Sequence, residues 1–538
     1  MTGRVPSLRA SRSRRAFLRL AAGACAGLGG ALLIGCGDEA PAADAGGPGR
    51  APRLVQPLGS DRPRRGTLRL GTTRTDVATA IRPLTAAQLV AVDPRTGLVH
   101  GDLADRVELR DGLDVVFHLH EGLRFHPDAD GLAAALTAED VRRDFQARRD
   151  LGEFLFTDVV TAIEAPDQTS VVLRLGAPFA LLFDFLGDPA RGAVRSLDRY
   201  AVVDLPLGAG PLIPAAVRDD ELILGANPLY HRAGLPLVEA VSMRLAGQRA
   251  DLDADFSNGG LDVRPGILTS PEGAVVRTVD RPARSLRGFA LSLLPGAGNE
   301  DPEATRRAAA FQDQRVRRAL ALALDREALL ADGDRPSGPV GPAFRADALP
   351  PDELAAHALY QHAPTEARAL IEAAGQLDLP FRLSAADARG QSALADTAVQ
   401  MWRAVGVAPR TVTLGEREWQ AALRSGDFET IVFEAAPLAT PDLGLRLHTS
   451  AGLEGVSPWG YSNPVYDAEV RRALTALDPG ERARRSHEAQ RTLLDDVPAL
   501  LPISSGAEYA SISERLAGYE WSAYDFNDTY LAARWAVA

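Results

Sequence analysis

The sequence predicts an α/β protein with mixed sheets and more than one domain. Segments with the period-two apolar pattern of strands alternate along the chain with segments of helical period. Such alternation is typical of α/β lobes. About 470 of the 538 residues follow residue 65. This length is too great for one hydrophobic core and indicates two or three domains.

Local signals fix several of the expected elements. Thr137 and Asp140 form a capping box, after which Val141 and Phe145 give a helix its apolar side. Pro498 ends the last long helix. We expect strands at 67–71, 114–119, 170–175, 221–224, 410–414 and 429–433. We expect a helical hairpin or kinked helix at 313–331, with Asp325 capping its second piece, and helices at 365–374, 392–405, 417–425 and 480–497.

The first 36 residues have the pattern of an export signal. The pair Arg14–Arg15 resembles the address of the bacterial route for folded proteins. An apolar stretch at 20–34 is too short for a comfortable membrane span, and it ends in a lipobox-like sequence before Cys36. We therefore expect residues 1–36 to be a lipoprotein signal segment with Cys36 as the lipidation site. The alternative is an uncleaved anchor helix.

Residues 37–65 are crowded with Ala, Gly, Pro, Asp and Arg and lack an apolar period, which predicts a flexible tether. The only cysteines, Cys25 and Cys36, lie in the signal segment, so the body has no thiol chemistry. The whole chain carries a net charge of −12. This balance argues against nucleic acid or anionic lipid as a partner, and membrane contact is expected only through the lipid anchor.

Nine short motifs occur in the order in which extracellular solute-binding proteins of ABC importers, of the peptide- and nickel-binding type, carry them. FQDQRVRRALALALDRE at 311–327 resembles the family pattern F.D.rVRqAl.yAiDRe, and LTAEDV at 136–141 resembles vTAeDV. Each motif alone is weak, but chance does not explain nine in the correct order. The other seven lie at 89–97, 103–105, 117–126, 207–211, 227–236, 459–467 and 527–530.

This resemblance implies a two-lobed type II periplasmic-binding-protein fold, or Venus flytrap, with a small domain inserted in the first lobe. It places the first lobe at 66–285, with the insertion at about 100–195, the second lobe at 286–498, and the return to the first lobe at 499–538. A ligand that touches both lobes stabilises the closed state, which the importer's membrane subunits then recognise. The expected ligand is a small organic solute, peptide-like or other, bound by a monomer without a cofactor.

The pocket segment departs from the family pattern. In peptide-binding relatives, the strand that corresponds to residues 429–433 is followed by an aromatic residue and then by an Asp that pairs with the ligand's α-amino group. Here the corresponding positions are Ala435 and Leu438. Burying an ammonium without a carboxylate is costly. We therefore expect a ligand without a free α-amino group, unless Glu434 or Asp442 replaces the missing carboxylate.

Three further residues are candidates for ligand contact. Trp419 corresponds to a pocket tryptophan of peptide-binding relatives and offers a stacking surface; alternatively it packs within its own lobe. Thr73 and Arg74 follow the first strand, where Arg74 either points toward a ligand anion or is solvated.

Metal binding and catalysis find little support. His118 and His120 share one face of a strand, with Glu121 and His126 nearby, but the resemblance places them in the scaffold of the insertion, so no metal is expected. No common catalytic motif is present. Two alternatives remain: a ligand sensor or repurposed binding lipoprotein without an importer, and a cell-surface hydrolase.

Overall fold

The computed structural model describes residues 64–73, 76–93, 99–110, 113–189, 191–198, 207–266, 277–294, 302–435, 440–452, 459–520 and 531–538. The predicted signal segment with Cys36, nearly all of the predicted tether, Arg74 and Leu438 lie outside these ranges. Within them, no helix is both long enough and apolar enough to cross a membrane. Arg65 donates its backbone N–H to the carbonyl of Leu237, so contacts with the body begin just before the expected start at residue 66.

A seven-stranded mixed sheet forms the centre of the first lobe. Its order is β10-β11-β12-β1-β13-β21-β14. Strand β1 is parallel to both β12 and β13, whereas β21 is antiparallel to β13 and β14. Leu68, Leu70 and Thr72 of β1 are buried while the residues between them are exposed or half-buried, which is the predicted period-two pattern. The bounds are β1 Thr67–Thr72, β10 Leu212–Arg218, β11 Glu221–Ala226, β12 Ala240–Leu245, β13 Val263–Pro265, β14 Arg277–Pro282 and β21 Ala507–Ile512.

A second, four-stranded sheet of order β5-β6-β8-β7 has a hydrophobic core of its own and is inserted between β1 and β10 of the first lobe. The helix α3 covers it, and the predicted capping box is confirmed: the Asp140 carboxylate accepts the Thr137 backbone N–H at 2.9 Å. The bounds of this insertion are β5 Ala104–Arg110, β6 Asp114–Leu119, α3 Ala138–Asp150, β7 Val160–Glu164, β8 Ser170–Leu175 and α4 Leu182–Gly187.

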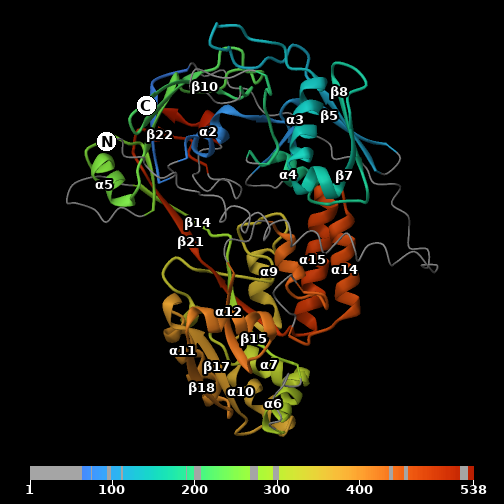
Figure 1. Cartoon of the computed structure of the whole chain (residues 1–538). Helices are drawn as coiled ribbons and strands as arrows, with labels where there is room; N and C mark the ends of the chain where they lie inside the picture. The colour runs from blue at the N-terminus through green and yellow to red at the C-terminus, as the bar shows by residue number, and fades with distance from the viewer. Residues whose placement is uncertain are drawn as a thin grey trace, which may run out of the picture.

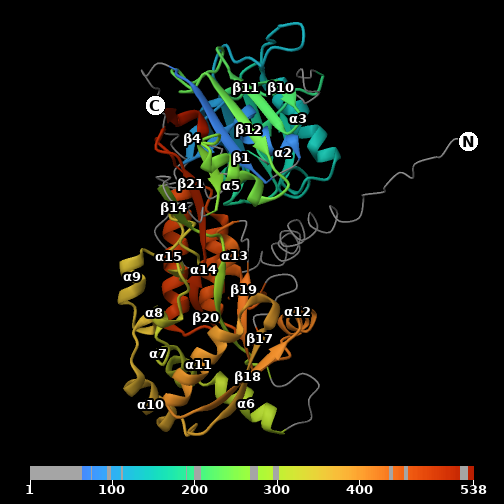
Figure 2. The same cartoon turned by 90° about the vertical axis from the view of Figure 1, so that its left-hand side faces the viewer.

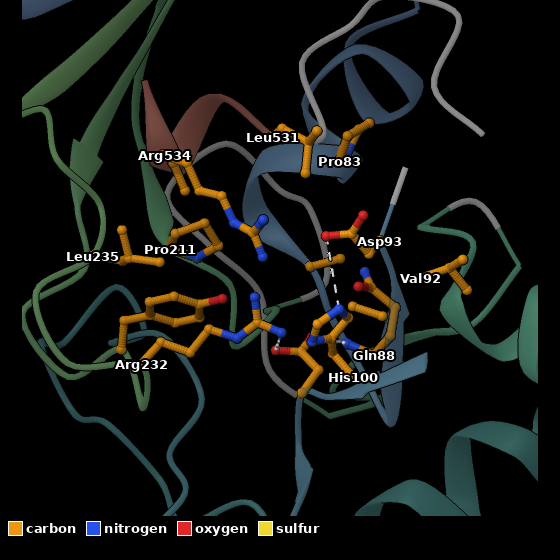
Figure 3. Close-up of a pocket in the computed structure, with 15 residues that line it drawn as sticks. Pro83, Gln88, Val92, Asp93, His100, Pro211, Arg232, Leu235, Leu531 and Arg534 are labelled. Carbon is orange, nitrogen blue, oxygen red and sulfur yellow. Dashed lines mark hydrogen bonds and ion pairs between the residues drawn. The ribbon is translucent and has the colours of Figure 1, made fainter. Parts of the chain in front are cut away.

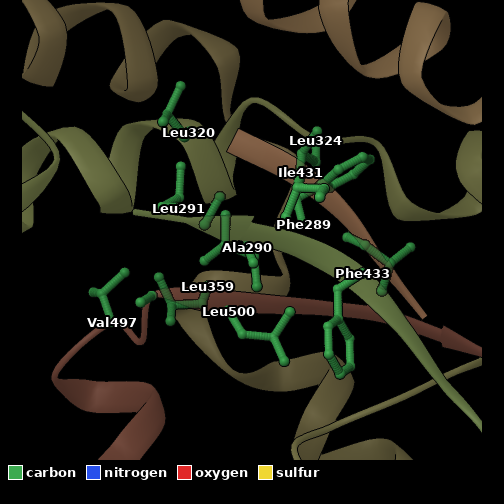
Figure 4. Packing of buried hydrophobic residues seen from close by; sticks show 14 of the residues in the cluster. Phe289, Ala290, Leu291, Leu320, Leu324, Leu359, Ile431, Phe433, Val497 and Leu500 are labelled. Carbon is green, nitrogen blue, oxygen red and sulfur yellow. The ribbon is translucent and has the colours of Figure 1, made fainter. Parts of the chain in front are cut away.

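A six-stranded sheet of order β16-β20-β15-β19-β17-β18 forms the second lobe. Strands β17 and β18 are parallel, and β17 is also parallel to β19. Its core contains Phe289, Leu320 and Phe433, packed between sheet and helices (Figure 4). The bounds are β15 Leu286–Leu291, β16 Arg335–Pro336, β17 Pro380–Ala386, β18 Ala408–Leu414, β19 Thr430–Ala435 and β20 Leu500–Ser505.

Several helices of the second lobe begin at side-chain N-caps, of which Asp325 was predicted. The segment expected as a hairpin or kinked helix forms two helices, with Asp313 capping one and Asp325 the other. The last long helix ends before Pro498, as predicted. The bounds are α6 Pro302–Gln312, α7 Gln314–Leu322, α8 Arg326–Leu329, α9 Pro351–Ala356, α10 Pro364–Ala373, α11 Ser392–Ala404, α12 Glu416–Ser425, α13 Asp442–Arg446, α14 Pro464–Thr475 and α15 Pro479–Asp495.

Smaller elements complete the first lobe. The bounds are α2 Val77–Thr85, β2 Ala87–Gln88, β3 Val90–Val92, β4 Val99–Gly101, the π-helix η2 Leu155–Val159, β9 Ala193–Val194, α5 Arg249–Ser257, β22 Leu516–Ala517, the 3-10 helix η5 Ala532–Arg534 and β23 Ala536–Val537; in the second lobe, the 3-10 helices η3 and η4 span Ala358–Tyr360 and Asp387–Arg389.

The chain crosses between the two lobes twice. It leaves the first lobe after β14 and enters the second at β15, and it returns from β20 to β21 through Gly506. Figures 1 and 2 show β14 and β21 running side by side toward the second lobe. The N–H of Ala283 in the first crossing donates to the carbonyl of Gly506 in the second at 2.7 Å. The two crossings therefore form one paired connection.

Candidate ligand site between the lobes

The central sheets of the two lobes face each other with the carboxyl ends of strands. Strand β21 leaves the crossing and runs into the first lobe antiparallel to β13, so the carboxyl ends of β13 and its parallel partners β1 and β12 point back toward the second lobe. In the second lobe, β19 ends opposite the start of β15, which follows the other crossing. Ligands of open α/β sheets bind beyond the carboxyl ends of the strands. The candidate ligand site therefore lies where these ends meet.

A cluster of polar side chains occupies this edge of the second lobe. The Arg287 guanidinium lies 3.2 Å from an Asp334 carboxylate oxygen and 3.7 Å from a Glu434 carboxylate oxygen. Ser504 donates to Asp334 at 2.9 Å, and the Gln391 side-chain amide donates to Glu434 at 3.4 Å. We call these five residues the Arg287 cluster. Two carboxylates share one guanidinium, so the cluster carries an excess negative charge.

Within this cluster, Glu434 is held more loosely than Asp334. The Asp334 side chain is 7% exposed and accepts hydrogen bonds of 2.9 and 3.2 Å, whereas the Glu434 side chain is 21% exposed and its two contacts are 3.4 and 3.7 Å long. Sequence reasoning identified Glu434 but missed Arg287, Asp334 and Gln391. The sequence carried no signal for these three, because Arg287 and Asp334 lie outside every predicted element and Gln391 only precedes the helix expected at 392–405.

Trp419 lies on α12, packed within its own lobe. Its side chain is buried, and its indole N–H donates to the carbonyl of Val432 at 2.9 Å. The Arg389 guanidinium lies 4.5 Å from the ring centroid and pairs with Glu416 at 2.8 Å. That hydrogen bond outweighs burial, so the pKa of Arg389 lies above and the pKa of Glu416 below its ordinary value. This geometry is that of the packing alternative, and ligand stacking on Trp419 stays a prediction.

Asp442 begins α13 and is buried, with its carboxylate 3.7 Å from the Arg446 guanidinium. Burial raises the pKa of Asp442, against a hydrogen bond from Thr440 and the nearby Arg446. One of its carboxylate oxygens has no hydrogen-bond partner within the described part of the chain. Asp442 is thus a buried acid of the second lobe. Its charged surroundings include Arg482 and, from the insertion, Asp184, so it is not part of the Arg287 cluster.

Thr73 is exposed and directly follows β1, at the carboxyl edge of the first-lobe sheet. The structure thus places Thr73 and Glu434 on the two edges that face each other. Arg74 and Leu438, which complete the predicted set, lie outside the described residues.

The histidines considered as metal ligands have separate surroundings. His118 lies 3.5 Å from Glu108, whereas His120 stacks near the ring of His231. His126 is buried against the carbonyl of Gly210, 3.0 Å from its ring nitrogen. No group of three or more potential metal ligands occurs in the described ranges.

A small polar cavity lies inside the first lobe and away from the facing strand ends (Figure 3). His100, Arg232 and Arg534 are among the residues around it. Its volume of about 40 Å³ leaves room for about three water molecules, which is too little for a peptide. Burial alone would raise the pKa of Asp102 in its wall, but Arg232, His231 and the Gln88 backbone N–H lower that pKa to about 2. The cavity is therefore part of the scaffold rather than the solute site.

Comparison with known proteins agrees with this architecture. Residues 99–455 match the model of the bacterial extracellular solute-binding proteins, family 5. Heme-binding protein A of Haemophilus influenzae is 21% identical over 80% of this chain and 83% of its own length. The glutathione-binding protein GsiB of Salmonella typhimurium is 23% identical, covering 78% of this chain and 84% of that protein.

Solved structures show the same fold. HbpA2 from Haemophilus parasuis superposes with a TM-score of 0.71 at 17% identity, covering 88% of this chain and all of that one. The unliganded open form of the periplasmic murein tripeptide-binding protein MppA gives a TM-score of 0.69 at 17% identity, covering 89% and 99%. The predicted two-lobed type II fold is thereby confirmed, and the chain belongs to family 5 of the bacterial extracellular solute-binding proteins.

Proposed function

We propose that this protein captures a small organic solute between its two lobes and delivers it to the permease subunits of an ABC importer. The observation that carries the proposal is that strand ends of both sheets face each other, with the Arg287 cluster on one of them. Relatives named for heme, glutathione and D,D-dipeptide support a ligand of this size range. Thr73, with Arg74, supplies contacts from the first lobe.

Glu434 is the residue to which we assign recognition of a hydrogen-bond donor or cationic group of the ligand. Its two contacts are long, and the cluster has one more carboxylate than guanidinium, so a positive group gains favourable interactions there. The position at which peptide-binding relatives carry an Asp holds Leu438. Glu434, near the end of β19, and Asp442 are the two candidates for replacing that carboxylate.

Mass spectrometry of molecules retained by gently purified protein identifies the ligand. Calorimetry with that ligand then compares the parent with Glu434→Gln. The control is Glu372→Gln, which removes a carboxylate paired with Arg368 on α10 of the same lobe. We expect Glu434→Gln to weaken binding on the order of tenfold or more, as for loss of a charge-assisted hydrogen bond, and the control to bind normally. Equal affinity of the parent and Glu434→Gln would transfer the role to another residue.

Calorimetry with a library of ordinary peptides tests separately whether the protein binds a free α-ammonium group although Leu438 stands in place of the family's Asp. If Glu434 does not accept an α-ammonium, di- to pentapeptides show no tight binding. Submicromolar binding that is lost on N-acetylation of the peptide, and lost again in Glu434→Gln, would show that Glu434 has taken over the ammonium. The same loss in Asp442→Asn alone would assign that role to Asp442.

Attachment to the cell membrane through lipidated Cys36 is a separate part of this proposal, supported by the lipobox-like sequence after the twin-arginine pair. Labelling with a palmitate analogue is expected in the parent and not in Cys36→Ser. Unchanged labelling in Cys36→Ser would rule out Cys36 as the lipidation site, and no labelling of the parent would favour the uncleaved anchor helix. Importer subunit genes beside this gene favour transport, whereas their absence favours a sensor.

A further inference from the structure

A second junction between the lobes exists beside the paired crossings. It is made by the turn between α14 and α15 of the second lobe, which reaches the α4 region of the insertion (Figure 1). The backbone N–H of Ala180 in the insertion donates to the carbonyl of Leu474 at 3.0 Å. Leu477, from the same turn, is buried in the hydrophobic core of the insertion. Backbone and apolar contacts thus join segments about 300 residues apart.

At the centre of this junction, Arg482 of α15 bridges two carboxylates from different lobes. Its guanidinium binds Asp347 of the second lobe through two hydrogen bonds of 2.9 and 3.0 Å. It also donates to the Asp184 carboxylate of α4 and, at 3.2 Å, to the carbonyl of Ala180. The side chains of Arg482, Asp184 and Asp347 are 6%, 3% and 6% exposed. The ionic bridge is therefore almost fully removed from water.

The two carboxylates have different roles in this arrangement. Asp347 belongs to the same lobe as Arg482, and its backbone carbonyl also accepts from Ser486 and Gln490, so it holds the guanidinium in place. Asp184 belongs to the other lobe, so its bond to Arg482 must break, together with the two hydrogen bonds of Ala180, when the lobes separate at this point. A buried ionic bridge has short range and requires defined geometry. Such a contact is either formed or broken, which suits a two-state element.

The junction is also next to the buried acid at the start of α13. The charges of Arg482 and Asp184 both act on Asp442, together with burial, Thr440 and Arg446. Asp442 follows, by a few residues, the end of β19, the strand that carries Glu434. A change at the junction therefore alters the electrostatic surroundings of the segment that leaves the candidate ligand site.

We propose that the Asp184–Arg482 bridge is a latch that holds the two lobes in the described arrangement and so sets the equilibrium between lobe positions. Asp184→Asn weakens only the bond between lobes and leaves the Arg482–Asp347 pair in place. Through population shift, the latch also tunes ligand affinity, and this last step rests on the proposed function.

The test measures the lobe spacing without ligand. Full-length protein carrying Cys25→Ser and Cys36→Ser receives spin labels at Arg110→Cys in the insertion and Arg368→Cys in the second lobe, both exposed positions. Asp184→Asn is expected to shift the ratio of the distance populations on the order of tenfold relative to the parent. The control Asp114→Asn, which breaks an ion pair within the insertion, is expected to leave the distribution unchanged.

Leu477→Ala weakens the same junction without changing a charge, and it is expected to shift the populations in the same direction. It serves as the deciding variant if Asp184→Asn does not fold. An unchanged distance distribution in a folded junction variant overturns the latch, whatever the ligand does. A shifted distribution with unchanged ligand affinity supports the latch and counts against the proposed ligand site between the lobes.

Discussion

Mild acid is expected to destabilise the first lobe through a single buried histidine. His126 is 1% exposed, and its ring nitrogen lies 3.0 Å from the carbonyl of Gly210. Its other ring nitrogen has no partner within the described residues. Burial lowers the pKa of His126 from 6.5 to about 4, although the hydrogen bond to Gly210 acts in the opposite direction. The folded state therefore keeps this ring neutral where the unfolded chain protonates it.

The sign and the size of the effect follow from this difference in pKa. Between pH 6.5 and 4 the unfolded chain binds more protons at His126, so stability falls as pH falls through that window. The gap of about 2.5 pH units, at about 1.4 kcal/mol each, corresponds to about 3 kcal/mol. Above pH 6.5 this contribution to stability is fully present. The pKa of Asp102, lowered to about 2, affects stability only in stronger acid.

Urea unfolding of the parent and of His126→Gln at pH 7.5, 6.0 and 5.0 measures the effect. Glutamine can donate to the Gly210 carbonyl but does not titrate. We expect the parent to lose stability toward pH 5 relative to the variant, by up to about 2 kcal/mol at that pH. Parallel pH dependences of the two proteins would refute the reasoning. His448→Gln provides a matched comparison in the second lobe, because burial lowers the pKa of His448 to about 3.

Three substitutions test the packing of the second lobe. Gly460→Ala is expected to destabilise it by about 2 kcal/mol or more in urea unfolding, because φ is +85° and a Cβ would lie 2.9 Å from the Leu293 backbone; a neutral result would mean that the loop adapts. Trp402→Phe removes the donor that binds the Leu320 carbonyl at 2.9 Å and is expected to cost about 1–3 kcal/mol, measured in the same way, unless another donor reaches that carbonyl. Asp313→Ala removes the N-cap of α7 and is expected to lower stability by about 1 kcal/mol and to speed amide exchange in its first turn; unchanged exchange would contradict a capping role.

Interactions between near neighbours were predictable from the sequence. The capping box at Thr137 and Asp140 and the caps at Asp313 and Asp325 each close over two or three residues, so the residue types reveal them. The end of α15 before Pro498 was predictable because proline disfavours a helical conformation in the residue before it. The ordered motifs predicted the family and its two-lobed fold.

The candidate ligand site was predictable only in part. Glu434 was identified because it lies near the position at which relatives carry the ligand-binding carboxylate. Its partner Arg287 lies on β15, much earlier in the chain, and nothing in the sequence connects the two. Trp419 shows the limit clearly: the pattern allowed both stacking and packing, and only its indole bond to Val432 and its burial reveal how it is held.

The sequence by itself determined the alternation of strands and helices, the helix ends and the family, because these depend on local hydrogen bonds, apolar period and motif order. Only the tertiary structure decided which charges meet. Arg287 and Asp334 are 47 positions apart, and Arg482 and Asp184 are 298 apart. Strand order and the two crossings bring such pairs together, and an isolated charge in the sequence carries no mark of its partner. Burial then makes these few contacts consequential, because a charge removed from water requires the partner that the fold supplies.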